Sequence, residues 1–197
     1  MTNDDLGRYL EFLQRAEQLK STVRTAYTAS GRRESTAEHS WRLALMALVF
    51  ENEFEGLDHH RILKLCLVHD LGEAVGGDIA AVDQKAPKAA EERRDLVDLC
   101  SSLPPEVRAG IIALWDEYEN AQTPEALVVK GLDKLETLIQ HNQGQNPDNA
   151  IDFRFNLDYG RRYTAAHPLL ERIRRLVDEA TARRAAENGP AGQAEEL

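Results

Sequence analysis

The chain has 197 residues, with 34 acidic and 24 basic side chains and a formal net charge of −10 at pH 7. This length suits a single domain with a sizeable core. The acidic surface would repel a phosphate backbone, which argues against nucleic-acid binding as the main role. The longest apolar run, LALMALVF at 43–50, is too short for a membrane span of about 20 residues. The N-terminus lacks the basic-then-apolar pattern of a signal peptide.

The two cysteines, Cys66 and Cys100, stand inside apolar helical patterns and form no CxxC pair. Such residues are typically buried thiols in a reducing compartment. We therefore expect a soluble, cytoplasmic protein.

Helical periodicity dominates the chain, and we find no two-residue alternation with hairpin turns. The first helical pattern, residues 4–20, is followed by a polar, glycine-containing connection, TAYTASGRRES. Ser35 or Thr36 is placed to cap the next helix, with Glu38 in the position of a capping box. This helix is expected to run through the apolar positions Trp41, Leu45, Leu48 and Val49, and Trp41 is expected to lie in the core.

Further helices are predicted at 58–72, from about 88 to the Leu103-Pro104-Pro105 break, at 105–119, at 124–142 and from Pro168 onward. Gly72 or the Gly76-Gly77 pair is expected to end the first of these.

The pattern shows no internal repeat and no linker that would divide the chain. Residues after about 185, AAENGPAGQAEEL, are small and polar, which predicts disorder. We therefore predict an all-α fold, a single compact multi-helix bundle over residues 1–185 with a disordered tail at 186–197.

Histidines and carboxylates interrupt these apolar helical patterns at four positions. They are His39 in AEHSWRLALMAL, the His69-Asp70 pair in KLCLVHDLGEAVGGDI, and Asp133 in ALVVKGLDKLETLI. Burying such groups without partners costs on the order of a few kcal/mol, so a shared partner is expected. Two imidazoles and two carboxylates suit divalent ions such as Mn²⁺, Co²⁺, Fe²⁺, Ni²⁺ or Zn²⁺. No thiolate belongs to the set, which argues against a structural zinc site.

A lone histidine on an apolar helix is more often a hydrogen-bonded core residue than a metal ligand. Four such residues, followed by Glu73 and Asp78, favour the metal-ligand interpretation. Glu73 is four residues after His69 and three after Asp70, which would place it on the same face of a continuous helix. Asp78 follows two glycines, where it could orient water, bind a sugar or remain a solvated acid.

The pattern H…HD…D resembles the HD-domain superfamily of metal-dependent phosphohydrolases. The segments EHSWRLALMA, LVHDLGEAVGGDIA and VVKGLDKLET resemble its 5′-deoxynucleotidase branch. The resemblance implies an all-helical, often homodimeric enzyme that removes phosphate from deoxyribonucleoside 5′-monophosphates with one divalent metal ion, Mg²⁺ being a further candidate. Two-metal relatives use extra histidines between the HD pair and the last aspartate, and residues 71–132 contain none.

The resemblance also implies roles for individual residues. The metal ligands would be His39, His69, Asp70 and Asp133. Glu73 and Asp78 would be the catalytic acidic groups, of which Glu73 is placed to shuttle a proton to or from water or the leaving 5′-oxygen. Arg24, fifteen residues before His39, would orient the phosphate, since a guanidinium binds phosphate through two parallel hydrogen bonds.

The substrate-contacting set implied by the resemblance is Arg24, Thr25, Asp70, Asp78, Ile79, Ala80, Ala81 and Asp133. Family members carry an aromatic residue directly after the first arginine or three residues after it. Thr25 and Tyr27 occupy these positions here, which leaves the sugar and base preference open.

Two alternative functions stay open at this point. One is an HD phosphohydrolase for another phosphorylated metabolite, such as a nucleoside polyphosphate or a cyclic nucleotide. The other is a metal-structured binding protein without turnover. The presence of Glu73 and Asp78 favours catalysis over the latter.

Overall fold

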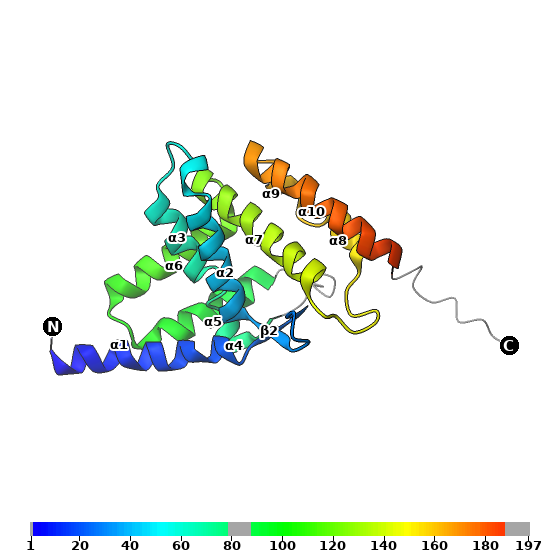
Figure 1. Ribbon diagram of the computed structural model, residues 1–197. Coiled ribbons are helices and arrows are strands. Elements are labelled where there is room, and N and C mark those ends of the chain that lie inside the picture. Colours follow the sequence, from blue (N-terminus) through cyan, green and yellow to red (C-terminus); the bar gives the residue numbers. More distant parts are fainter. Residues whose placement is uncertain (1, 79–87, 188–197) are drawn as a thin grey trace.

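The computed structural model describes residues 2–78 and 88–187 and confirms the all-helical fold (Figure 1). The helices of the first half are α1 (Asn3–Ala16), η1 (Glu17–Lys20), α2 (Thr36–Val49), η2 (Glu51–Glu53), α3 (His59–Val68) and α4 (Glu73–Gly76). The second half contains α5 (Lys88–Leu99), η4 (Cys100–Ser102), α6 (Pro105–Asn120), α7 (Pro124–Gln143), α8 (Phe153–Asp158), α9 (Arg161–Thr164) and α10 (Pro168–Glu187).

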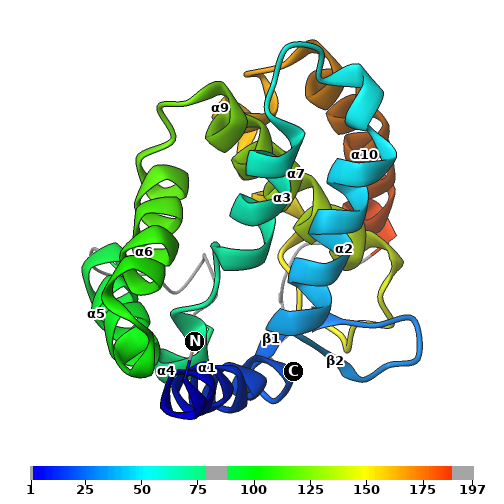
Figure 2. The same cartoon turned by 90° about the vertical axis from the view of Figure 1, so that its left-hand side faces the viewer.

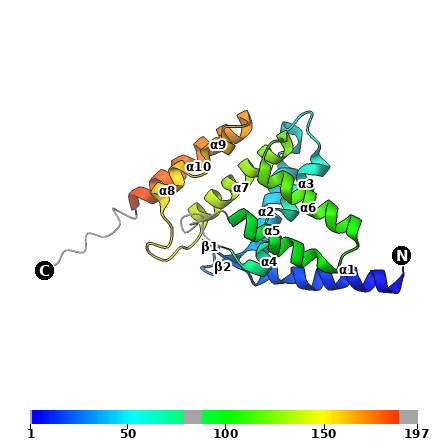
Figure 3. The ribbon, with the colours of Figure 1, turned by 180° about the vertical axis from the view of Figure 1, so that it is seen from behind.

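Helix α7 occupies the centre of the fold. Helices α2, α3 and α6 pack on one side of it and α9 and α10 on the other, with α8 packed on α10, as the opposite views in Figures 1 and 3 show. Its apolar residues join those of α2 and α3 in the main core, which includes Leu43, Ile62, Leu65, Val129, Leu132, Leu135 and Leu138. A helix with neighbours on both sides holds its polar side chains away from water, so each of them needs a protein partner.

A smaller core packs against α1, the long helix at the bottom of Figure 1. It is built from Leu96, Cys100, Leu103 and Trp115, with Tyr9 and Phe12 of α1 packed against it. Cys66 and Cys100 are buried and form no disulfide, as predicted. Within the described residues, no helix is long and apolar enough to cross a membrane.

The connection predicted as a polar loop instead forms an antiparallel hairpin. Strand β1 (Val23–Tyr27) pairs with β2 (Arg33–Ser35), and the register is irregular within β1. The turn between them contains Gly31 at a φ of 81°, a backbone conformation that favours glycine. The irregular register breaks the alternation of side chains, so the sequence carries no clear strand pattern here.

The start of α2 is as predicted. The Ser35 side chain accepts a hydrogen bond from the Glu38 backbone at 3.3 Å, and the Glu38 carboxylate accepts one from the Ser35 backbone at 2.9 Å. This reciprocal pair is a capping box.

Helix α2 exposes Trp41, which was predicted to lie in the core. Its apolar stripe is solvent-exposed, with fractional exposures of 64%, 40%, 54% and 68% for Trp41, Leu45, Leu48 and Val49. The buried side consists of Thr36, His39, Ser40, Leu43 and Ala47. The helix therefore turns a mixed polar and apolar face, including His39, toward α7.

Helix α3 ends at Val68, earlier than the predicted end at Gly72. A turn over residues 69–72 leads into the short helix α4, which ends at Gly77 with a φ of 79°. At the other end of the chain, α10 continues to Glu187, past the predicted start of the tail, and residues 188–197 lie outside the described residues.

Candidate metal centre

Three elements bring the four predicted ligands together. His39 lies in the first turns of α2, Asp133 in the middle of α7, and His69 and Asp70 directly after the last residue of α3. Helices α2, α3 and α7 pack against one another (Figure 2). His39, His69 and Asp133 are buried, and the Asp70 side chain is 18% exposed.

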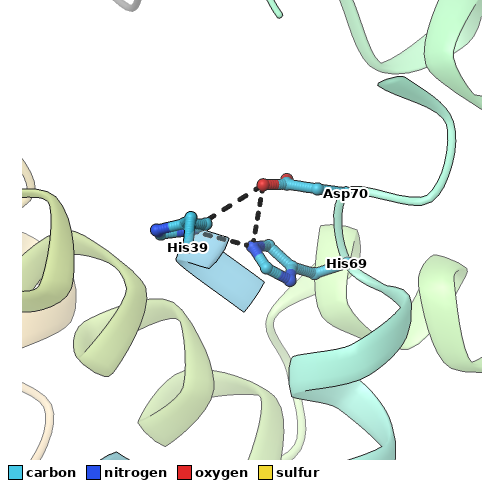
Figure 4. Close-up of side chains that lie close together, drawn as sticks. All are labelled: His39, His69 and Asp70. Atoms are coloured by element: carbon cyan, nitrogen blue, oxygen red, sulfur yellow. Dashed lines mark hydrogen bonds and ion pairs between the residues drawn. The ribbon is translucent and has the colours of Figure 1, made fainter. Parts of the chain in front are cut away.

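The other three predicted ligand atoms lie close to Nε2 of His39. The Nε2 atom of His39 lies 3.2 Å from Nε2 of His69, 3.3 Å from Oδ1 of Asp133 and 3.7 Å from Oδ2 of Asp70. The Nε2 atom of His69 is 3.0 Å from the same Asp70 oxygen. Figure 4 shows the His39, His69 and Asp70 side chains pointing toward one another. His39, His69 and Asp70 therefore present ligand atoms within 4.8 Å of one another, and Oδ1 of Asp133 lies beside Nε2 of His39.

Both imidazoles are oriented by hydrogen bonds on their far side. Nδ1 of His39 is bonded to Oε2 of Glu136, and Nδ1 of His69 donates to the backbone carbonyl of Cys66 at 2.9 Å. Each ring therefore presents Nε2 to the centre. Two such nitrogens 3.2 Å apart require a proton or a cation between them, because their lone pairs would otherwise repel. This donor set fits one divalent ion.

The protonation states also favour a cation. Burial raises the pKa of the Asp133 and Asp70 carboxyls, but the surrounding cationic groups outweigh it, and both pKa values lie well below the usual range. Burial and Arg24 lower the pKa of His39, but Glu136 and Asp133 raise it, to about 10. Two ionised carboxylates thus face a basic imidazole, and a metal ion would displace the proton of that imidazole.

Asp133 is held by two further groups. Its Oδ2 atom accepts hydrogen bonds from the Tyr118 hydroxyl at 2.6 Å and from Nζ of Lys134 at 2.9 Å. The other oxygen, Oδ1, is the one that faces His39. The hydroxyl and the ammonium group thus fix which oxygen points into the centre.

Arg24 of β1 lies directly beside the centre. Its Nη1 atom is 3.5 Å from Oδ2 of Asp70, and its Nη2 donates to the Thr137 hydroxyl at 3.1 Å. Burial disfavours the guanidinium charge, but Asp70, Asp78 and other nearby carboxylates raise its pKa further. Arg24 is therefore a permanent cation next to the predicted ligands.

Behind Arg24 lies a buried network that sequence reasoning missed. Glu34 is 3% exposed, with its two oxygens 3.5 Å from Nε of Arg24 and 4.0 Å from Nη2 of Arg42. Burial and the negative charge of Glu136 raise the pKa of Glu34 to about 7. The spacing of Arg42 and Glu136, each three residues after a predicted ligand, is the one signal in the sequence that could have found them.

The position of Glu73 differs from the one predicted. Glu73 is the first residue of α4. It therefore does not lie on one continuous helix with His69 and Asp70, which was the prediction. Its carboxylate is buried and accepts a hydrogen bond from the Thr36 hydroxyl at 3.1 Å. Thr36 and His39 are three residues apart on the buried side of α2, which places Glu73 on the His39 side of that helix.

The other predicted substrate contacts are less completely described. Asp78 is half-buried and close enough to Arg24 to raise the pKa of that residue. Thr25 is half-buried next to Arg24 on β1. Ile79, Ala80 and Ala81 lie outside the described residues. The roles of all these residues remain predictions.

This helical fold, with two histidines and two aspartates converging from three elements, is that of an HD domain. The HD-domain family model matches residues 16–174, and the chain belongs to this family. Both the superfamily and the branch expected from the motifs are confirmed.

The similar proteins include named enzymes. The 5′-deoxynucleotidase HDDC2 of Dictyostelium discoideum is 32% identical over 162 residues, which cover 77% of this chain and 85% of that protein. The Homo sapiens HDDC2 is 37% identical over 139 residues, or 68% of this chain and 67% of the relative. A crystal structure from Magnetospirillum magnetotacticum, described as a predicted metal-dependent phosphohydrolase, matches with a TM-score of 0.79 at 28% identity. It covers 92% of this chain and 97% of that one.

Proposed function

We propose that this protein is a metal-dependent phosphomonoesterase that hydrolyses nucleoside 5′-monophosphates, deoxyribonucleotides above all, to nucleoside and phosphate. The observation that carries the proposal is the guanidinium of Arg24, which lies 3.5 Å from Asp70 of the candidate centre on a side chain that is 12% exposed. It gives an acidic chain a local positive site for a phosphate next to a metal ion. The relatives named 5′-deoxynucleotidase support the substrate class.

In the proposed reaction, a water oxygen attacks phosphorus, the bond to the 5′-oxygen breaks, and that oxygen takes up a proton to become the nucleoside hydroxyl. A divalent ion at His39, His69, Asp70 and Asp133 would lower the pKa of water toward about 7 and stabilise charge on the phosphoryl group. Arg24 holds the phosphate in line for attack. Glu73 transfers the proton, and Asp78 orients the water or binds the sugar.

We further propose that the centre holds a single ion. The absence of histidine from residues 71–132 supports this, as does the donor set of two imidazoles and two carboxylates. Such a set accepts Co²⁺, Mn²⁺, Fe²⁺, Ni²⁺, Zn²⁺ or Mg²⁺, so availability and the remaining coordination positions decide among them.

Phosphate release from a nucleotide panel tests the proposal. The panel pairs dAMP with AMP and dTMP with UMP, and adds cyclic AMP and a nucleoside triphosphate, each with Mn²⁺, Co²⁺, Zn²⁺ or Mg²⁺. We expect metal-dependent release from the deoxyribonucleoside monophosphates and none from the Asp70→Ala variant. Cleavage restricted to the cyclic nucleotide or the triphosphate would reject the monoesterase activity in favour of another HD phosphohydrolase.

Two variants separate the proposed roles. Glu73→Gln should abolish phosphate release while the protein still binds the metal, because only proton transfer is removed. Arg24→Ala should raise KM and lower kcat in a folded protein. Full activity of Glu73→Gln would remove Glu73 from catalysis, and unchanged kinetics of Arg24→Ala would remove that residue from the site.

We also propose that the protein forms a homodimer through the exposed apolar stripe of α2. Trp41, Leu45, Leu48 and Val49 lie one or two turns apart on one side of the helix, and exposed apolar stripes of this kind commonly mark interfaces. Light scattering should give a dimer for the wild type and a monomer for Leu48→Glu. Leu176→Glu, at an exposed leucine of α10, is the matched control and should remain dimeric. A monomeric wild type would reject the proposal.

We place the protein in the cytoplasm. Its two buried cysteines are unpaired, which suits a reducing compartment. Cell fractionation with an antibody to the protein tests this location.

A further inference from the structure

A fully buried carboxylate lies directly behind His39. Glu136 of α7 is 0% exposed, and its Oε2 atom is hydrogen-bonded to Nδ1 of His39. In Figure 4 this nitrogen of the His39 ring points away from His69 and Asp70. The Glu136 carboxylate therefore does not face the ligand atoms, and it acts on the centre only through the imidazole.

The second oxygen of Glu136 is held by an arginine. Nε of Arg42 donates to Oε1 at 2.6 Å, and Nη2 of Arg42 lies 3.5 Å from the Glu136 backbone carbonyl. Arg42 is three residues after His39 on α2, so both side chains reach Glu136 from one helix. Because an unpaired buried carboxylate is costly, Glu136 depends on its two partners, His39 and Arg42, to remain charged.

The two histidines of the centre differ in what supports them. Nδ1 of His69 donates to a neutral backbone carbonyl, that of Cys66 at 2.9 Å. Nδ1 of His39 instead meets a carboxylate that itself pairs with a guanidinium. An anionic acceptor on one nitrogen fixes the ring orientation and makes the other nitrogen a stronger electron donor. The support of His39 also comes from side chains, so mutation can remove it.

We propose that Glu136 and Arg42 are positioning residues that hold Nε2 of His39 in place as a ligand and strengthen its bond to the metal ion. The inference rests on the metal centre of the proposed function, but not on its substrate. Glu136 is bonded to His39 and Arg42, whereas Arg24 pairs with Asp70 and Glu34. Removal of Glu136 or Arg42 should therefore weaken metal binding first, and turnover only as a consequence.

The test is titration of the metal-free protein with Co²⁺ or Zn²⁺ against a chelator of known affinity. We expect Glu136→Gln, which keeps an oxygen acceptor but loses the charge, to raise the dissociation constant by about 10-fold to 100-fold. Glu136→Leu should raise it further. Arg42→Met, which leaves the carboxylate in place, should raise it by less than Glu136→Gln.

Asp178→Asn is the matched control. It breaks another arginine–carboxylate pair, in which Nε of Arg174 donates to Oδ1 of Asp178 at 2.6 Å on α10, away from the centre. Metal affinity should be unchanged in this variant. Thermal stability should fall in both Asp178→Asn and Glu136→Gln, because each variant loses an arginine–carboxylate pair. If Asp178→Asn weakens metal binding as much as Glu136→Gln does, the effect is general destabilisation and the inference is wrong.

A spectroscopic measurement covers the case in which Glu136→Leu does not fold. In the zinc-loaded protein, the Nδ1 proton of His39 should give a strongly downfield, slowly exchanging NMR signal. This signal should move upfield in Glu136→Gln, whereas the signal of His69 should stay unchanged. A wild-type protein that binds no metal would refute the metal centre itself. Metal affinity and a His39 signal that are unchanged in Glu136→Gln would overturn only the role of Glu136.

Discussion

Tyr118 and Lys134 both donate hydrogen bonds to the same oxygen of Asp133. These bonds determine which Asp133 oxygen faces the centre. The Tyr118 hydroxyl is buried on α6 and donates at 2.6 Å to Oδ2. Burial and the nearby Asp133 charge raise the pKa of this phenol well above its usual value, so the hydroxyl keeps its proton and remains a donor. The free oxygen, Oδ1, is thereby left to face His39.

Replacing Tyr118 with phenylalanine should therefore destabilise the protein without creating a cavity. A hydrogen bond to a charged group contributes roughly 1.5 to 3 kcal/mol, and Lys134 still binds the oxygen, so we expect a loss of about 1 to 3 kcal/mol. Urea unfolding of the metal-free protein measures it. Tyr9→Phe, in the smaller core under α1, is the control and should have little effect. Equal stability of Tyr118→Phe and the wild type would contradict this role.

His141 is a buried histidine outside the centre. It lies on α7 and its Nδ1 atom accepts a hydrogen bond from the Asn156 side chain at 3.0 Å. Burial, together with the positive charge of Arg24, lowers its pKa from 6.5 to about 4. The imidazole is therefore neutral in the folded protein at pH values where the unfolded chain already protonates it.

This difference predicts acid sensitivity. The neutral His141 contributes its full stability above pH 6.5, and this contribution is lost as the pH falls from 6.5 toward 4, because only the unfolded state takes up the proton in that range. The total is on the order of 3 kcal/mol. His141→Asn, which keeps an acceptor for Asn156 but does not titrate, should lose less stability between pH 7 and 5 than the wild type does. Parallel pH profiles of unfolding for the two proteins would refute this.

At the level of single residues, the sequence predicted the four groups that converge and missed what supports them. His39, His69, Asp70 and Asp133 stand out because they are polar residues in apolar helical patterns. Tyr118 and Glu136 do not stand out in the sequence. The polar tip of a tyrosine or glutamate side chain on a helix usually reaches solvent. Only the packing of α6 and α2 on α7 brings them to Asp133 and His39.

The β1–β2 hairpin positions Arg24, and its place is set by the end of α7. The Gln140 side chain donates to the Tyr27 carbonyl at 2.5 Å, and the Gln145 backbone donates to the Thr28 carbonyl at 3.1 Å. Gly144 lies between these two contacts, where an added Cβ would overlap the Tyr27 carbonyl oxygen. The hairpin approaches α7 this closely because residue 144 has no side chain.

Gly144→Ala should therefore displace the hairpin. Overpacking of this kind costs about 1 to 3 kcal/mol, and we expect a raised KM for nucleotide together with unchanged metal affinity, because the predicted ligands lie outside the hairpin. Unfolding and metal titration measure the two effects separately. Gly110→Ala, on α6 where an added Cβ meets nothing within 4 Å, is the control and should be neutral or slightly stabilising. Weakened metal binding in Gly144→Ala would contradict the separation of the two sites.

Helices were easier to predict than the hairpin or the exposed faces. The capping box at Ser35 and the apolar periodicity of α7 are local signals that survive folding. The hairpin depends on the long-range contact with Gly144, and its register irregularity hides the strand pattern. Trp41 was expected in the core because an apolar helix side that binds another chain has the same sequence pattern as one that packs on its own core.

In the whole molecule, the net charge of −10 is compatible with a candidate centre that binds a phosphate group. The overall negative charge would repel a free nucleotide, and Arg24 supplies a local positive charge beside the centre. Because the carboxylates of Asp70 and Asp133 both lie beside Nε2 of His39, a divalent cation bound there should also stabilise the fold.

We therefore expect the metal-free protein to melt earlier than the loaded one. A ligand at 100 times its dissociation constant adds about 2.7 kcal/mol, which for a chain of this size raises Tm by about 5 to 10 °C. Differential scanning fluorimetry with and without Co²⁺, Mn²⁺ or Zn²⁺ measures the shift. Asp70→Ala should show a much smaller one, and an equal shift in that variant would place the stabilising ion elsewhere.

The most direct measurement is phosphate release from dAMP while the chelator-treated protein is titrated with metal. We expect no release from the metal-free protein and a rise that saturates at about one equivalent of metal per chain, because the proposed centre holds one ion. We also expect no rise in Asp70→Ala. Saturation near two equivalents would contradict the single-ion centre. Release that persists in the metal-free protein, or in Asp70→Ala, would contradict the central claim that these four residues form the catalytic metal site.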